Sequence, residues 1–224
     1  MTDIKSNLEK IKAQLPDHVK LVAVSKTKPN EDIQAAYETG QRIFGENKAQ
    51  EMQGKAEELP KDIEWHMIGH LQRNKVKYIA PFVSLIHSID SWRLLKEVNK
   101  RAKNEDRVID CLLQIHIAKE ESKFGLDEDE LADILYSEEF ENLENIRIVG
   151  LMGMATLTEN EEQIRREFKS LKDLFDKLKK DKFALEDSFK ELSMGMSSDF
   201  KIAIEEGSTM VRIGSDIFGA RNYG

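Results

Sequence analysis

Short apolar runs alternate along the chain with longer segments in which apolar residues recur every three or four positions. The short runs are typical of buried strands, and the longer segments are typical of amphipathic helices. Strands are predicted at LVAVS (21–25), RIFGE (42–46), WHMIG (65–69), SLIHSI (84–89), DCLLQIHI (110–117), IRIVGLMGM (146–154), KELSMG (190–195) and TMVRIG (209–214).

The helical segments between these strands have recognisable first residues. Asn30 is expected to cap a helix that reaches Gly40, and Asp90 or Ser91 to start the helix that contains LLKEV. Thr158 and Glu161 have the spacing of a capping box, ahead of a helix whose apolar face is formed by Phe168, Leu171, Leu174, Phe175 and Leu178.

Eight strands, each but the last followed by a helix, favour parallel pairing with right-handed crossovers. The pattern predicts a single α/β domain over residues 1–224, folded as a closed (β/α)8 barrel of the TIM type, whose usual length the chain approaches. An amphipathic helix within residues 1–15 would cover what a short final helix leaves exposed. An open doubly wound sheet is the alternative.

The charge and composition of the chain narrow the range of possible functions and compartments. The formal net charge of −8 argues against a nucleic-acid binder, and the basic run RNKVK (73–77) is interpreted as a solvated helix face. No apolar stretch approaches the length of a membrane span, and the N-terminus lacks the apolar core of a signal peptide. The single cysteine, Cys111, is expected to be a core thiol in a reducing compartment, so the cytoplasm is predicted.

Lys26 lies where the first predicted strand ends, and in a barrel the reacting groups gather at the carboxyl ends of the strands. A lysine that is partly desolvated there has a lowered pKa, so its neutral amine can attack a carbonyl group. A solvated lysine at the start of a loop is the competing interpretation.

The segments SMGMSSD (193–199) and GSDIFG (214–219) follow the last two strands, where such barrels commonly bind phosphate. Gly195 allows a close approach of the backbone to a ligand, and Ser197 and Ser198 can cap the helix that follows. Ordinary turns would use the same residue types, but the two segments together favour a phosphate site.

Three more residues could contribute to the same site: Arg212 on the last strand, Asn47 after the second and Lys123 after the fifth. An ion pair, a helix cap and a solvated lysine are their respective alternatives. His66 and His70 straddle a strand end and do not form a HExxH motif, so no metal site is predicted.

An amine opposite a phosphate site calls for a ligand that has an aldehyde or ketone at one end and a phosphate at the other. Pyridoxal 5′-phosphate (PLP) has this form, and so does a sugar phosphate that is handled by a Schiff-base aldolase. The chemistry of the residues leaves both open.

Sequence blocks across nearly the whole chain resemble the pyridoxal phosphate homeostasis protein family (the YggS/PROSC type). The blocks are VAVSKTKP, FGENKAQE (44–51), WHMIGHLQRNKVKYI (65–79), HSIDS (87–91), EESKFGL (120–126), GLMGMAT (150–156) and LSMGMSSDFKIAIEEGSTMVRIGSDIFGARNY (192–223). The resemblance implies the barrel of the alanine racemase N-terminal domain (PLP fold type III).

The resemblance also implies that Lys26 forms the internal aldimine with PLP. It implies phosphate contacts from Ser197, Gly214 and Ser215 with backbone amides around Met196, further cofactor contacts from Arg212 and Asn47, and a position for Lys123 near the mouth. It implies no catalytic residue.

Members of this family are regarded as non-enzymatic: they hold PLP and buffer or deliver it within the cell. The implied partners are PLP and apo PLP-dependent enzymes, with no membrane or nucleic acid, and the chain is expected to be a monomer. A PLP-dependent amino-acid racemase or lyase is the alternative, but it needs a second acid or base. Tyr37, Tyr78, Tyr136 and Tyr223 lie in predicted helices or at the tail.

Overall fold

Eight parallel strands close into a barrel in the computed structural model of the chain, which describes residues 3–119 and 124–220. The strands are β1 (Lys20–Val24), β2 (Ile43–Glu46), β3 (Glu64–Met67), β4 (Leu85–Ile89), β5 (Ile109–Gln114), β6 (Ile146–Met152), β7 (Glu191–Met196) and β8 (Met210–Ile213). Each strand pairs with its sequence neighbour, and β1 pairs with β8 from Lys20↔Met210 to Ala23↔Ile213. The predicted barrel is confirmed, and the open sheet is wrong.

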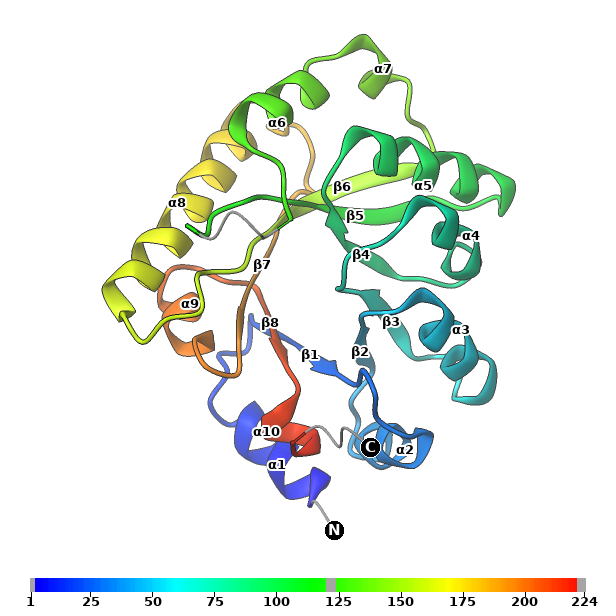
Figure 1. Ribbon diagram of the computed structural model, residues 1–224, viewed down its shortest axis with the longest axis vertical. Helices are drawn as coiled ribbons and strands as arrows, with labels where there is room; N and C mark the ends of the chain where they lie inside the picture. Colours follow the sequence, from blue (N-terminus) through cyan, green and yellow to red (C-terminus); the bar gives the residue numbers. More distant parts are fainter. Residues whose placement is uncertain (1–2, 120–123, 221–224) are drawn as a thin grey trace.

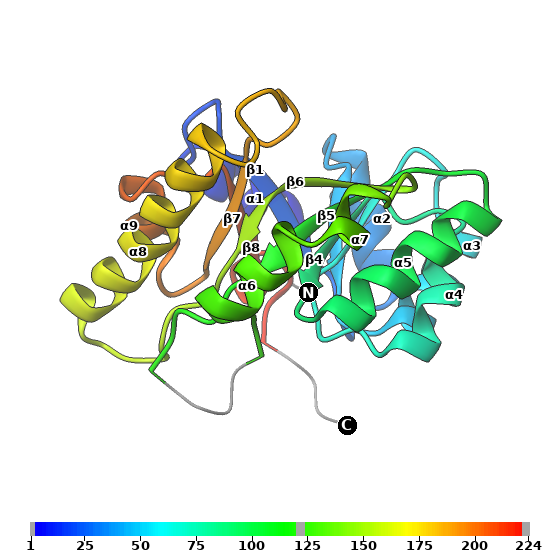
Figure 2. The ribbon, with the colours of Figure 1, turned by 90° about the horizontal axis from the view of Figure 1, so that it is seen from above.

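Helices lie around the outside of the barrel (Figures 1 and 2). They are α1 (Ile4–Lys12), α2 (Asn30–Glu38), α3 (Ala49–Glu58), α4 (Val76–Ile79), α5 (Trp92–Asn104), α6 (Glu128–Leu135), α7 (Glu138–Glu141), α8 (Glu161–Lys180), α9 (Phe200–Glu205) and α10 (Ser215–Phe218), with a 3-10 turn η1 (Arg73–Lys75) before α4. None of the helices in the described ranges is long and apolar enough to cross a bilayer.

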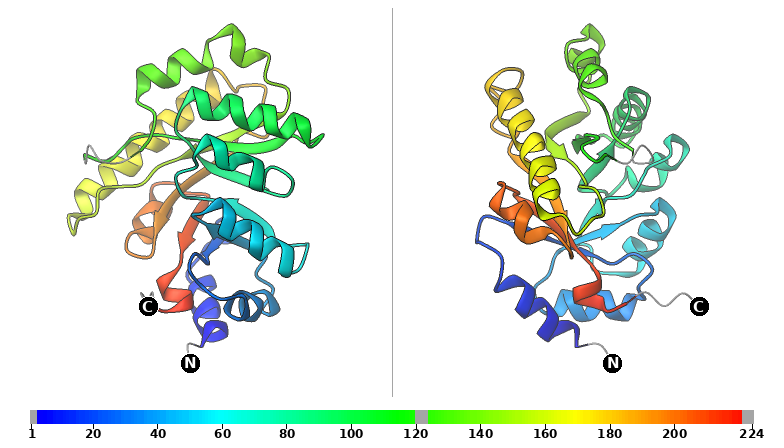
Figure 3. Two further views of the ribbon diagram at one scale, coloured as in Figure 1. Left: turned by 45° about the vertical axis from the view of Figure 1, so that its right-hand side comes forward. Right: turned by 60° about the vertical axis from the view of Figure 1, so that its left-hand side comes forward.

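The main core fills the space between the strands and the helices, because parallel strands are covered on their outer face by the crossover helices. The long helix α8, yellow in Figure 3, buries Phe168, Leu171, Phe175 and Leu178 against the sheet, and Leu174 is partly buried, as the spacing predicts. Cys111 is buried in the same core, and burial raises the pKa of its thiol.

The N-terminal helix α1 lies beside the short last helix α10, and Figure 1 shows the two side by side. Ile4, Leu8 and Ile11 point into the core, which confirms the predicted apolar face. The side-chain amide of Asn7 donates to the carbonyl of Ile217 (3.1 Å), so a polar contact joins the two ends of the barrel sequence.

Three of the predicted helix starts are wrong. Pro29, not Asn30, is the N-cap of α2, and the Asn30 amide donates to Glu58 Oε2 instead (2.5 Å). Asn160, not Thr158, caps α8, because Asn160 lies directly before the first helical residue and its side chain accepts from the Gln163 amide. Thr158 lies two residues before this cap, and its Oγ1 accepts from the Asn160 amide. The third error, in the segment before α9, belongs to the site described below.

The predicted start of α5 is confirmed, since Ser91 Oγ accepts from the Leu94 amide. Strand ends differ slightly from the prediction: β5 ends at Gln114, before His116, and β1 ends at Val24. Lys26 is therefore two residues beyond its strand, in the loop at the barrel mouth.

We expect Leu8→Ala to lower the free energy of unfolding by about 2–4 kcal/mol, because it removes a fully buried side chain and leaves a cavity under α1. Leu8 is 1% exposed, whereas Leu185 is 96% exposed, so Leu185→Ala is the matched control and should change stability by less than about 0.5 kcal/mol. Urea denaturation measures both. Equal effects of the two variants would contradict the packing of α1 described here.

Candidate functional site

A cavity of about 390 Å³ opens at the carboxyl ends of the strands. Its lining includes every residue that the sequence nominated for a cofactor site within the described ranges: Lys26, Asn47, Met196, Ser197, Arg212, Gly214 and Ser215. These residues come from four different strand ends, so the closed barrel brings together positions that are far apart in the chain. Lys123 lies outside the described residues.

Lys26 is half-buried at one wall of this cavity. Lys28, which the sequence analysis did not nominate, also lines the cavity and donates to the carbonyls of Phe218 (2.8 Å), Gly219 (3.2 Å) and Ala220 (3.0 Å). It ties the loop after β1 to the end of α10. In the sequence, its position as the second lysine of SKTK, directly after the predicted strand, could have indicated this role.

Two hydroxyl groups line the same cavity. Ser215 Oγ, after β8, lies 3.3 Å from Ser197 Oγ, after β7. Gly195 has φ 97, a left-handed conformation that favours glycine, and a Cβ there would lie 2.6 Å from the Cβ of Ala203. The glycine therefore lets the β7 loop turn tightly onto α9.

The segment before α9 differs from its prediction. Neither Ser197 nor Ser198 caps the helix, because Asp199 is the N-cap residue, and its Oδ1 accepts from the Met196 amide at 2.6 Å. The Met196 amide, which was expected among those that help to hold phosphate, is engaged by this carboxylate. The serine hydroxyls are left at the cavity wall instead of being drawn into the helix end.

Arg212 lies at the base of the cavity and is buried. Its guanidinium donates to Ser193 Oγ (2.6 Å) and to the carbonyl of Gly153 (3.2 Å). Burial lowers the Arg212 pKa to about 10, partly offset by Asp199, so the group stays protonated at neutral pH. A fixed positive charge therefore faces the ligand position, where it could contact a ring nitrogen or an anion.

A chain of buried hydrogen bonds continues from Ser193 down the barrel interior. Ser193 Oγ lies 2.9 Å from His87 Nδ1, and His87 Nε2 lies 3.0 Å from His66 Nδ1. Burial lowers the pKa of His66 to about 3 and that of His87 well below its usual value, so both rings are neutral. These histidines support Arg212. Within the described ranges, no cluster of three or more His, Cys, Asp or Glu side chains is arranged to hold a metal ion.

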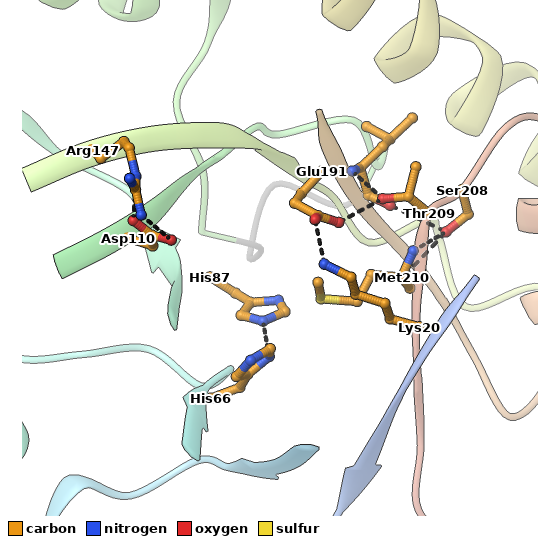
Figure 4. A network of polar contacts seen from close by, with 10 residues as sticks. Lys20, His66, His87, Asp110, Arg147, Glu191, Ser208, Thr209 and Met210 are labelled. Atoms are coloured by element: carbon orange, nitrogen blue, oxygen red, sulfur yellow. Dashed lines mark hydrogen bonds and ion pairs between the residues drawn. The ribbon is translucent and has the colours of Figure 1, made fainter. Parts of the chain in front are cut away.

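A second cavity of about 550 Å³ lies at the amino ends of the strands, below His66. Figure 4 shows the ion pairs beside it, Lys20 with Glu191 and Arg147 with Asp110. These four charged side chains thus satisfy one another, whereas barrel chemistry gathers at the carboxyl ends. The upper cavity is therefore the candidate site.

Asn47 follows β2 and is half-buried at the rim of the upper cavity. Gly69 packs directly against it: a Cβ at Gly69 would lie 2.6 Å from the backbone oxygen of Asn47. The two loops after β2 and β3 are consequently held together, and the Asn47 side chain keeps a fixed place.

A buried ion pair supports the Lys26 loop from behind. Glu46 Oε1 accepts from Ser25 Oγ (2.6 Å) and from Lys55 Nζ (2.8 Å). The second oxygen, Oε2, is buried and has no hydrogen-bond partner among the described residues. Burial raises the Glu46 pKa to about 6, although Lys55 and Ser25 act in the opposite direction.

The fold and the site define a class of protein: a closed parallel barrel in which an amine, two hydroxyls and a buried guanidinium surround one cavity, a set of groups suited to a phosphorylated carbonyl compound. The chain matches the family model "Alanine racemase, N-terminal domain" over residues 1–222. It is 43% identical over 206 residues to the pyridoxal phosphate homeostasis protein of Aquifex aeolicus (91% of this chain, 88% of the relative). The match to the Vibrio alginolyticus protein of that name is 40% identical and covers both chains completely. The chain belongs to the pyridoxal phosphate homeostasis protein family.

Solved structures agree with this assignment. PipY of Synechococcus elongatus, solved without PLP, superposes with a TM-score of 0.90 at 36% identity, and covers 97% of this chain and 100% of its own. Its structure with PLP bound gives a TM-score of 0.87. Alanine racemase of Clostridium difficile gives 0.81 at 15% identity, over 60% of its chain, which shows a shared fold alone.

We expect Gly69→Ala to lower the free energy of unfolding by about 1–3 kcal/mol, because the added methyl group meets the Asn47 backbone. Gly54→Ala is the matched control: Gly54 lies within α3 with nothing within 4 Å of an added Cβ. It should raise stability by about 0.5–1 kcal/mol, since alanine is the better helix former. Thermal unfolding checks both, and a neutral Gly69→Ala variant would contradict the close approach.

Glu46 generates a pH prediction. Its folded-state pKa, about 6, lies above the ordinary value of 4.5, so the folded protein holds this proton more tightly than the unfolded chain. The contribution of Glu46 to the free energy of unfolding therefore falls as pH rises through that interval. Relative to Glu46→Gln, which has no such proton, the wild type should gain stability as pH drops. Urea denaturation of both proteins, at pH values above and below the interval from 4.5 to about 6, tests this. If the free energy of unfolding changed with pH in the same way in both proteins, the prediction would be contradicted.

Proposed function

We propose that this chain binds PLP in the upper cavity through Lys26, and that it holds the cofactor for intracellular PLP homeostasis by buffering or delivering it. The observation that carries the proposal is the convergence of Lys26, the Ser197–Ser215 pair and Arg212 on one cavity. The PLP-bound structure of PipY, a relative of 36% identity, supports the same ligand.

The residues present fit the chemistry of PLP. When bound, PLP supplies an aldehyde carbon that a lysine amine can attack with loss of water. The Lys26 amine lines the cavity, and Ser197, Ser215 and the Gly214 backbone, which also line it, can bind a phosphate. Arg212 and Asn47 remain to contact the ring between them. Ile68 and Met154 give the cavity apolar walls suited to an aromatic ring.

A holding role suits the cavity better than catalysis. No tyrosine in the described ranges lines it; Tyr37 and Tyr136 are exposed or partly exposed and donate to Asp62 and Asp181. Ser198 and Ser215 are exposed, so water reaches the mouth and the linkage can exchange. The racemase or lyase alternative rests on a fold likeness of 15% identity.

We further propose that the protein acts as a monomer in the cytoplasm and that its partners are apo PLP-dependent enzymes. The buried thiol of Cys111 suits a reducing compartment, and the acidic net charge suits neither nucleic acid nor an anionic lipid surface.

We expect wild-type protein to take up PLP and to become yellow, and Lys26→Ala to lose this absorbance while it keeps its fold, because the amine that forms the covalent bond is gone. Lys48→Ala is the matched control: Lys48 is exposed beside the mouth and does not line the cavity, so its spectrum should match the wild type. Circular dichroism confirms folding.

A Lys26→Ala variant with the wild-type spectrum would refute the assignment of the lysine. A wild type that stays colourless with PLP, and that borohydride traps only in the presence of a sugar phosphate, would favour the aldolase alternative.

A further inference from the structure

The residue after Lys26 has an unfavourable backbone conformation. Thr27 has φ 63, in the left-handed region, where a β-branched residue is rare because its side chain crowds the backbone. Within the described ranges, Asp106 is the one other non-glycine residue with positive φ. Such a conformation persists only where neighbouring contacts hold it, and it is commonly found at ligand sites.

Helix α3 supplies those contacts. Glu51 Oε1 accepts from the Thr27 amide at 2.6 Å and from Lys55 Nζ at 2.7 Å. Lys55 also donates to the carbonyl of Ser25 (2.9 Å). Partial burial raises the pKa of Glu51, but the hydrogen bonds from Lys55 and Thr27 outweigh it and lower the pKa below its usual value, so the carboxylate is charged.

The backbone on both sides of Lys26 is thus held by one connected group. The carbonyl before Lys26 accepts from Lys55, and the amide after it donates to Glu51. The Lys28 amide donates to the same Ser25 carbonyl (3.0 Å), which closes a tight turn around Lys26. Neither Glu51 nor Lys55 lines the cavity, so any influence on a ligand acts through the turn that carries Lys26 and Lys28.

We infer that Glu51 and Lys55 are positioning residues for Lys26: they hold the Ser25–Thr27 backbone in a strained turn that keeps the amine in the cavity. The inference rests on the proposed binding of PLP at Lys26. Without the Glu51 carboxylate, Thr27 can relax to a common conformation, and the Cα of Lys26 moves with it. PLP then loses affinity, although no group that touches it has changed.

Three variants separate this role from a general loss of stability. Glu51→Ala removes the acceptor of the Thr27 amide. Glu51→Gln removes the charge but keeps a side-chain oxygen that can accept the same hydrogen bond. The double variant Glu51→Ala with Thr27→Asn restores the preference for the left-handed conformation by another route, because asparagine tolerates it.

Asp110→Ala is the matched control at the far end of the barrel, where Figure 4 shows Asp110 paired with Arg147. The Asp110 side chain is 30% exposed and that of Glu51 is 24% exposed, so the two variants remove comparable carboxylates from an ion pair. The control leaves the Glu51 contact to Thr27 and the Lys55 contact to Ser25 unchanged.

Two measurements follow. The dissociation constant of PLP should rise about tenfold in Glu51→Ala, as the loss of about 1.4 kcal/mol would produce. It should stay within about twofold of wild type in Glu51→Gln, recover in the double variant and remain unchanged in Asp110→Ala. In cofactor-free protein, hydrogen exchange of the Lys28 amide should quicken in Glu51→Ala alone.

The inference is overturned if Glu51→Ala binds PLP as tightly as wild type, or if Thr27→Asn fails to restore binding to a folded double variant. If wild-type protein does not bind PLP, the proposed function fails instead. In that case, hydrogen exchange of the Lys28 amide still tests whether Glu51 stabilises the Ser25–Thr27 backbone, because this measurement needs no cofactor.

Discussion

The pairing of β1 with β8 is the contact on which the site depends. It joins the first strand to the last, from Lys20↔Met210 to Ala23↔Ile213, and so sets the loop that carries Lys26 beside the loop that carries Ser215. In an open sheet the first and last strands would not pair with each other, so the amine and the hydroxyls would have no common cavity. Closure of the barrel therefore creates the site as well as the core.

The closed barrel also has a polar interior that supports a buried charge. The Arg212 guanidinium would be costly to bury alone, but Ser193 and the Gly153 carbonyl accept its hydrogen bonds, and two neutral histidines continue the network below. On the other side of the cavity, Glu46 and Lys55 support the Lys26 loop. Both supports consist of buried, hydrogen-bonded side chains, which a binding site needs in order to hold a small ligand in one orientation.

Much of the fold and of the candidate site could be predicted from the sequence, because both depend on local patterns. Eight apolar runs separated by helical spacing predict the barrel, and the strand ends then place Lys26, Ser197 and Ser215 on one rim. Two helix starts were wrong because competing residues with similar capping ability stand within two positions of each other, as at Thr158 and Asn160. At α2 the N-cap is Pro29, which has no side chain that can cap. The left-handed Thr27 could not be predicted, since its stabilising contact comes from Glu51, which lies on helix α3 and is distant in the sequence.

The most direct test of the central claim is to reduce the PLP-loaded protein with borohydride, digest it and locate the modified lysine by mass spectrometry. The account predicts one pyridoxyl group on the peptide that contains Lys26, because the strained turn holds this amine in the cavity that the two serine hydroxyls line, whereas the Lys28 amine is engaged by backbone carbonyls. Modification of Lys28 or of Lys123 with Lys26 intact would contradict it, as would a label scattered over exposed lysines.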